Sequence, residues 1–172
     1  MTEIICISGK AMAGDKEMAA RMLKEELEKG KKRVLITHYA DPLKRICRDW
    51  FGWDGRMDAT GRSFLRYVGT DIVRSQRPDF WVDFTLGLLS MMGDEWDYVI
   101  IPDCRHHNEI DLERYGFQPR HIRIEGNPMR QNAHTQRGPL GRAAPDFTIV
   151  HDDMPGRLRS EVAAVAQNLV CA

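Results

Sequence analysis

The sequence predicts an α/β protein whose five parallel strands form one sheet flanked by helices. Short apolar runs alternate with stretches of helical periodicity along the 172 residues, and this alternation is typical of repeated β-α units. The chain is long enough to bury a substantial core, so we expect residues 1–172 to form a single domain. The runs predicted as strands are residues 4–8, 33–37, 98–103, 121–124 and 147–150.

The helix predicted after the first strand has one apolar face, with Met18, Met22, Leu23 and Leu27 at helical spacing. This spacing favours core packing for both methionines over a role as ligands. Gly30 follows the last apolar residue and supplies the expected end of the helix. We therefore predict that this helix covers the sheet and ends before the second strand.

A second helix is predicted from Asp41, because Asp41-Pro42 combines a capping residue with a proline at the first helical position. It should end near Gly52. Residues 53–93 look mainly helical, so they form a candidate insertion that could close over a ligand at the carboxyl edge of the sheet. The terminal helix, residues 156–170, should pack on the sheet through an apolar face formed by Leu158, Val162, Val165 and Leu169.

Composition and charge exclude several classes of partner. The chain has 25 Lys and Arg against 25 Asp and Glu, so it has no overall charge to attract a long nucleic acid or an acidic membrane. No apolar run approaches the roughly 18 residues of a membrane span. The four scattered cysteines form no C-x-x-C pair, which argues against zinc and favours reduced thiols. We expect a cytoplasmic protein with no membrane partner and no extended nucleic-acid footprint.

The turn after the first strand resembles a phosphate-binding loop. Such loops read G-x-x-x-x-G-K-[S/T], because backbone N–H groups and the helix end hold phosphates, the lysine reaches the outer phosphates and the hydroxyl holds magnesium. Gly9 and Gly14 have the required spacing, but Asp15 follows and Lys16 comes one position late, before Glu17. Because adjacent helical residues point about 100° apart, the shift redirects the lysine unless the loop bulges. The alternative is a glycine-containing turn that binds nothing.

Two further features suit phosphate chemistry at the carboxyl edge of the sheet. Asp103 ends the third apolar run, where an acid can hold magnesium beside phosphates or can cap the next helix. Residues 125–144 form a predicted loop that is unusually long for a compact domain and contains Arg130, Arg137 and Arg142. Mobile arginines neutralise charge during phosphoryl transfer. The alternative is a solvated basic loop.

Four blocks in order along the chain carry a family resemblance. They are Tyr-Ala-Asp-Pro-Leu-Lys at 39–44, Gly-Thr-Asp-Ile-Val-Arg at 69–74, Pro-Asp-Phe-Trp at 78–81 and Ile-Pro-Asp-Cys-Arg-His-His-Asn-Glu at 101–109. With the glycine loop, these blocks resemble the bacteriophage deoxynucleoside monophosphate kinases and their adenylate-kinase-like bacterial relatives over residues 3–153. The resemblance implies a P-loop NTPase fold of the nucleoside monophosphate kinase type, with an acceptor-binding region at about 53–93 and a lid at about 125–144.

The resemblance also implies a reaction in which the γ-phosphate of ATP passes, with Mg²⁺ as cofactor, to a nucleoside or deoxynucleoside monophosphate. The expected ATP-binding residues are Gly9, Lys10, Ala11, Ala13, Gly14, Asp15, Lys16 and Glu17. The expected acceptor-binding residues are Asp41, Lys44, Arg66, Arg74, Trp81, Asp103 and Arg105, with Asp103 also the expected magnesium ligand. The expected catalytic side chains are Lys16, Arg74, Arg105, Arg130 and Arg137. A homodimer and a phage origin, with activity in the host cytoplasm, are further expectations.

Several of the acceptor residues also have a structural alternative. Lys44 and Arg66 suit solvated helix positions, and Trp81 suits a packed core as well as base stacking. Arg74 and Arg105 are stronger candidates, because a guanidinium can bind a phosphate through two hydrogen bonds.

The sequence departs from the family pattern at two places. Residues 14–17 read Gly-Asp-Lys-Glu where the family usually has Gly-Lys-Asp-Thr, and residues 134–137 read His-Thr-Gln-Arg where a His-x-Ser-Glu element is often found. Three functions therefore stay open. They are a nucleoside monophosphate kinase, a catalytically impaired nucleotide-binding protein, and a P-loop kinase acting on a modified base in phage DNA.

Overall fold

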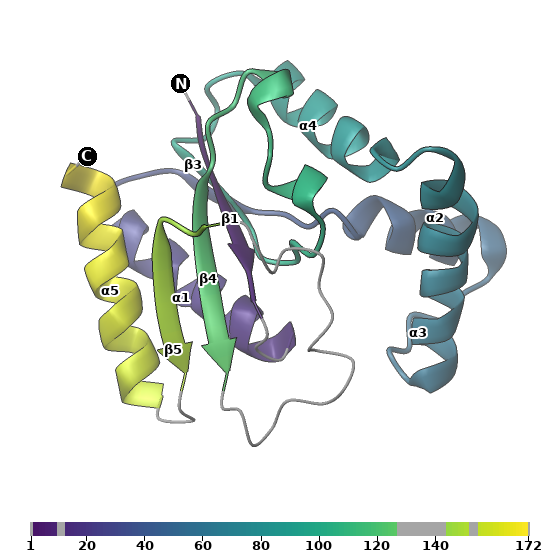
Figure 1. Ribbon diagram of the computed structural model, residues 1–172, viewed down its shortest axis with the longest axis horizontal. Helices are drawn as coiled ribbons and strands as arrows, with labels where there is room; N and C mark the ends of the chain where they lie inside the picture. Colours follow the sequence, from purple (N-terminus) through teal and green to yellow (C-terminus); the bar gives the residue numbers. More distant parts are fainter. Residues whose placement is uncertain (1, 10–12, 127–143, 152–154, 172) are drawn as a thin grey trace. The chain divides into compact units, whose positions relative to one another are not determined.

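The computed structural model describes residues 2–9, 13–126, 144–151 and 155–171, and it has the predicted α/β architecture with one five-stranded, all-parallel sheet. The strand order is β2-β3-β1-β4-β5 (Figure 1). All five predicted strands are confirmed. Their bounds are Glu3–Ser8 for β1, Val34–Ile36 for β2, Tyr98–Ile101 for β3, Arg120–Gly126 for β4 and Phe147–His151 for β5.

Some strand ends differ from the predicted ones. β3 ends at Ile101, and the next residue, Pro102, has no N–H with which to continue the ladder. β4 runs on to Gly126, which pairs with His151 of β5. The first two residues of the predicted lid therefore belong to the sheet, and residues 127–143 lie outside the described part of the chain.

Helices α1 (Ala13–Lys29) and α5 (Pro155–Cys171) pack together with the sheet around the main apolar core. Figure 1 shows α5 running beside β5. Met22 is buried and Met18 packs at the edge of the core, as the helical spacing predicts. The four apolar residues predicted to face the sheet from the terminal helix are all buried, namely Leu158, Val162, Val165 and Leu169.

The chain divides into two compact units. Unit 1 comprises Met1–Thr37 and Gly93–Ala172, and contains the sheet, α1, α5 and two short 3₁₀ helices, η2 (His107–Glu109) and η3 (Glu113–Tyr115). Unit 2 comprises His38–Met92, which are described throughout and contain no strand. Residues 53–92 are mainly helical, as predicted, but the unit begins before the predicted insertion and also includes the helix predicted from Asp41. Its helices are α2 (Asp41–Phe51), α3 (Ala59–Arg66), the π-helical continuation η1 (Tyr67–Arg74) and α4 (Phe80–Met92).

The start of α2 corrects one prediction. Ala40 occupies the N-cap with a helical backbone, and Asp41 is the first helical residue, so Asp41 does not cap the helix. Its carboxylate instead accepts a hydrogen bond from the backbone N–H of His38 at 3.1 Å and lies 2.9 Å from the Nδ1 of the same residue. The predicted end is confirmed, because Gly52 adopts a left-handed φ of 68° and its N–H bonds to the carbonyl of Cys47.

Candidate functional site

The two glycines of the predicted phosphate loop differ in whether the fold requires glycine. Gly9 has a φ of +130°, and a Cβ at that position would lie 1.9 Å from the carbonyl oxygen of Ile124 on β4. The packing of Gly9 against β4 is therefore sufficient to require glycine at this position, without any bound phosphate. Gly14 is exposed in the first turn of α1, and a Cβ there would meet nothing within 4 Å. The described structure contains no steric reason for glycine at position 14.

Asp15 and Lys16 point to different parts of the sheet. The Oδ1 atom of Asp15 lies 3.8 Å from Nε2 of His151, at the end of β5. Lys16 is 7% exposed, and the charges that act on it belong to residues that follow β3. Strands β1 and β4 lie between β3 and β5 in the sheet. The one-residue shift therefore places the lysine toward β3 and not toward β5.

The ammonium of Lys16 lies in an environment that opposes its charge. Burial, and then the positive charge of Arg105, lowers the pKa of Lys16 below its usual value, whereas the carboxylates of Asp103 and Glu109 act in the opposite direction. The structure thus brings together three residues that the sequence predicted for the site, Lys16, Asp103 and Arg105. An anion placed among these cations would stabilise the charged form of the lysine.

Glu109 holds the turn that carries Asp103 and Arg105. Its side chain is 2% exposed, and Oε2 accepts hydrogen bonds from the backbone N–H groups of Arg105 at 2.5 Å and His106 at 2.9 Å. His106 in turn forms the N-cap of η2, with Glu109 as the third helical residue of a capping box. Asp103 is therefore not the helix cap that the sequence left open as an alternative.

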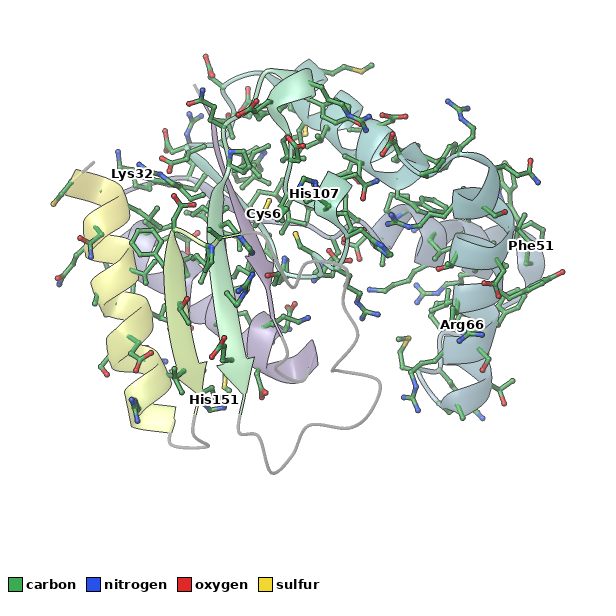
Figure 2. All side chains as sticks on the ribbon, viewed as in Figure 1. Cys6, Lys32, Phe51, Arg66, His107 and His151 are labelled. Atoms are coloured by element: carbon green, nitrogen blue, oxygen red, sulfur yellow. The ribbon has the colours of Figure 1, made fainter. Side chains whose placement is uncertain are left out.

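Two buried thiols lie beneath this turn. The Sγ atoms of Cys6 and Cys104 are 3.5 Å and 3.8 Å from the carbonyl oxygen of Glu109. Burial, together with the neighbouring Cys6, raises the pKa of the Cys104 thiol well above its ordinary value. Cys6 and His107, both labelled in Figure 2, lie in this part of unit 1. All four cysteines are free, as predicted.

A buried hydrogen bond fixes the end of β1. The hydroxyl of Ser8, directly before Gly9, lies 2.6 Å from Nε2 of His121 on β4. Burial, and then the charge of Arg123, lowers the pKa of His121, which favours the neutral ring. The pair anchors the strand at the point where it enters the predicted loop.

The expected acceptor-binding residues of unit 2 have varied surroundings. The Lys44 ammonium lies 3.3 Å from Oδ1 of Asp41. Burial raises the pKa of Asp41, but the hydrogen bond and charge of His38, followed by Lys44, outweigh it and leave the pKa below its usual value. Arg66 is exposed, in line with its solvated alternative.

Arg74 and Trp81 complete this part of unit 2. Nη1 of Arg74 donates to the carbonyl of Pro78 at 3.4 Å. Trp81 is 4% exposed and its Nε1–H bonds to the carbonyl of Gly69 at 3.1 Å. Of the two roles that the sequence left open for Trp81, core packing is the one seen here.

Some predicted site residues fall outside the described structure. These are Lys10, Ala11, Arg130 and Arg137, together with the side chain of Ala13. Glu17 is described, and its carboxylate pairs with Nε of Arg21 at 3.1 Å along the same helix.

Sequence reasoning missed the supporting residues of the site. In the sequence, Glu109 is only the last residue of the block at 101–109, and its role is not evident because its capping-box partner, His106, is not the usual serine or threonine. The Ser8–His121 and Asp15–His151 contacts join residues far apart in the chain. No local pattern indicates such pairs.

Among the described residues, no group of three or more His, Cys, Asp or Glu side chains is arranged to hold a metal ion. The described helices include none that is both long and apolar enough to cross a membrane. A scan against models of protein families and a search of curated proteins found no match to the sequence.

Proposed function

We propose that the protein is an ATP-dependent phosphotransferase of the P-loop type that converts a nucleoside or deoxynucleoside monophosphate to the diphosphate. The observation that carries this proposal is the position of Lys16, a buried ammonium at the β3 side of the sheet edge beside Asp103 and Arg105. Burial of an ammonium group costs free energy unless the group is paired with opposite charge. The phosphates of bound ATP would supply that opposite charge.

The described residues fit ATP and magnesium. Mg²⁺ keeps several waters and usually takes only one or two protein carboxylates beside phosphate oxygens, so it does not need a cluster of protein ligands. The partly buried Asp103 would supply that carboxylate. Magnesium would neutralise phosphate charge, and Lys16 and Arg105 would hold the phosphates from the protein side.

The transfer needs little covalent chemistry from the protein. An acceptor phosphate is already anionic at neutral pH, so its attack on the γ-phosphate is limited by charge repulsion and positioning. The proposed roles of Arg74, Lys44 and Asp41 are to bind and orient this acceptor. The neutral, buried pair of Ser8 and His121 has a positioning role only, because it holds the entry to the loop.

The test is a coupled assay of ADP release with ATP and each common ribo- and deoxyribonucleoside monophosphate. We expect release that depends on both substrates, and Lys16→Met should reduce kcat/KM by at least about 100-fold, as expected for loss of a phosphate-binding charge. The matched control is Lys29→Met, at an exposed lysine that pairs with Glu26 at the other end of α1. No ADP release with any monophosphate would contradict the proposal.

A second test uses the register of the loop. Exchanging the two residues, Asp15→Lys with Lys16→Asp, would turn the lysine toward β5 and place a third carboxylate beside Asp103 and Glu109. The position of Lys16 therefore predicts that the exchange abolishes ATP binding. A gain of activity would show that a lysine at position 15, on the β5 side, binds the phosphates better than Lys16. That result would contradict the role proposed for Lys16.

Gly14→Ala separates ligand contact from folding. A Cβ at this position meets nothing within 4 Å, so alanine should stabilise the fold by roughly 0.4–1 kcal/mol, because it reduces the conformational freedom of the unfolded chain. If phosphates approach the backbone there, the same change weakens ATP binding. A rise in stability with unchanged ATP affinity would argue against a phosphate at Gly14.

A second candidate function is nucleotide binding without turnover. It is favoured by Glu17, which follows Lys16 where a magnesium-binding hydroxyl is usual and whose carboxylate is paired with Arg21. Calorimetry with ATP would then show binding, while the ADP assay shows none. An absence of binding in calorimetry would exclude both candidates.

A further inference from the structure

One helix of unit 2 has an unusual backbone. Helix η1 continues α3 without a break, because Arg66, labelled in Figure 2, keeps helical backbone angles at the junction. Over its eight residues the π-helical hydrogen bonds join residues five apart, and the bond from the N–H of Ser75 to the carbonyl of Thr70 closes the last turn. Such turns are rare and often lie at functional sites. This one therefore needs a structural explanation.

Gly69 fixes the place where η1 packs within unit 2. It is buried, and a Cβ there would lie 2.4 Å from Cδ2 of Leu43 on α2. Glycine thus lets η1 lie against this side chain without displacing it. The carbonyl of Gly69 also accepts a hydrogen bond from Nε1–H of Trp81, at 3.1 Å. Neighbours on both α2 and α4 therefore hold the backbone of η1 at one residue.

The π-helical spacing decides which way Arg74 faces. Arg74 follows Gly69 by five residues. At about 100° per residue, an α-helix would turn it roughly 140° away from the packed side. Hydrogen bonds between residues five apart instead set Arg74 nearly above Gly69. The exposure of the side chains agrees, because Thr70, Asp71 and Ile72 are exposed whereas Arg74 is partly buried.

Two hydrogen bonds join the two blocks at residues 69–74 and 78–81. In each bond the first residue of one block meets the last residue of the other. Gly69 accepts from Trp81 at 3.1 Å, and Pro78 accepts from Arg74 at 3.4 Å. The π-helical turn thereby places the guanidinium of Arg74 beside the second block. A guanidinium can bind a phosphate through two hydrogen bonds.

We propose that the π-helical turn of η1 orients Arg74 toward the acceptor nucleotide, and that Gly69 and Trp81 are positioning residues that hold this turn. This inference rests on the proposed function for the class of ligand, a nucleoside monophosphate. It gives Trp81 an indirect role in acceptor binding, through the backbone of η1 and not through stacking on the base. An α-helical register in the same segment would turn the arginine away from the acceptor.

Calorimetric binding of the common nucleoside and deoxynucleoside monophosphates, measured without ATP, tests the orientation of Arg74. The exchange Arg74→Ser with Ser75→Arg keeps composition and length, but it turns the arginine one residue further from the packed side. We expect it to raise the Kd of the preferred monophosphate at least about tenfold, as Arg74→Ala should. The matched control is Arg45→Ala, at an arginine of α2 whose side chain is 77% exposed and pairs with Asp49. It should leave the Kd unchanged.

Deletion of Ile72 tests the role of the π-helical spacing. With one residue fewer, an α-helix sets the arginine four residues after Gly69 and about 40° from the packed side, so its direction is kept. We expect near-native monophosphate affinity from the deletion. Insertion of an alanine after Ile72 should instead raise the Kd at least about tenfold. Circular dichroism and urea unfolding show which variants fold, and the exchange and the deletion decide the question if the insertion prevents folding.

The support of the turn is tested with Trp81→Phe, which keeps a ring but loses the bond to Gly69. It should raise the monophosphate Kd severalfold and leave the affinity for ATP unchanged. The proposal is overturned by unchanged monophosphate affinity in the folded exchange variant, by loss of affinity on deletion of Ile72, or by a wild-type chain that binds no monophosphate. ADP release is a separate readout. Its absence, together with monophosphate binding that depends on Arg74, would contradict the kinase function and support this inference.

Discussion

Removing the Glu109 carboxylate should be among the most destabilising single changes at the sheet edge. In Glu109→Ala, the N–H groups of Arg105 and His106 lose their shared acceptor, and the side chain that they lose is 2% exposed. A hydrogen bond to a charged group contributes about 1.5–3 kcal/mol, so we expect a loss of roughly 3–5 kcal/mol. Glu109→Gln retains an oxygen without the charge, and should cost about half as much.

Urea unfolding followed by circular dichroism measures these differences. At roughly 2–4 °C per kcal/mol for a chain of this size, Glu109→Ala should also lower the Tm by about 6–20 °C. The control is Glu113→Ala, at an exposed glutamate of η3 in the same segment, which should change stability by no more than about 0.5 kcal/mol. Equal effects of Glu109→Ala and Glu113→Ala would refute the assignment of Glu109 as the residue that holds this turn.

Three further changes test separate parts of the fold. Gly9→Ala should destabilise by at least about 3 kcal/mol in thermal unfolding, because its Cβ would overlap the Ile124 carbonyl, and a stable, unaltered variant would contradict the backbone geometry. Trp81→Phe should cost about 1–3 kcal/mol through the lost bond to Gly69, whereas unchanged stability with a raised KM for the acceptor would favour base stacking. The pKa of His121 in the folded state lies below 6.5, the ordinary value that applies to the unfolded chain. At pH values between these two pKa values, the unfolded chain therefore binds more protons. Stability in urea should therefore fall as pH drops below about 6.5, and less so in His121→Gln; parallel pH profiles would count against this.

The strands could be predicted from the sequence because each is an almost continuous apolar run. Residues 4–7 and 98–101 are buried throughout, as expected for strands of a parallel sheet covered on both faces. Helix ends marked by glycine, such as Gly52, were also predictable, since a left-handed backbone favours that residue. Asp41 was wrong as a cap because His38, three residues earlier, competes for its carboxylate.

The candidate site was only partly predictable. The sequence singled out Lys16, Asp103 and Arg105, but their mutual approach depends on the sheet order, which places β3 beside β1. The direction of Lys16 depends on how α1 is rotated over the sheet. Local spacing gives the angle between Asp15 and Lys16 but not the side of the sheet that each one faces. The supporting role of Glu109 depends on a capping box whose N-cap residue is His106 and not the usual serine or threonine.

The central claim is tested most directly with ATP that is radiolabelled at the γ-phosphate. The account predicts that the folded protein transfers the label to a nucleoside monophosphate, that Lys16→Met abolishes the transfer and that Lys29→Met retains it. A folded wild-type protein that labels none of the common monophosphates, or a Lys16→Met variant as active as the wild type, would contradict it.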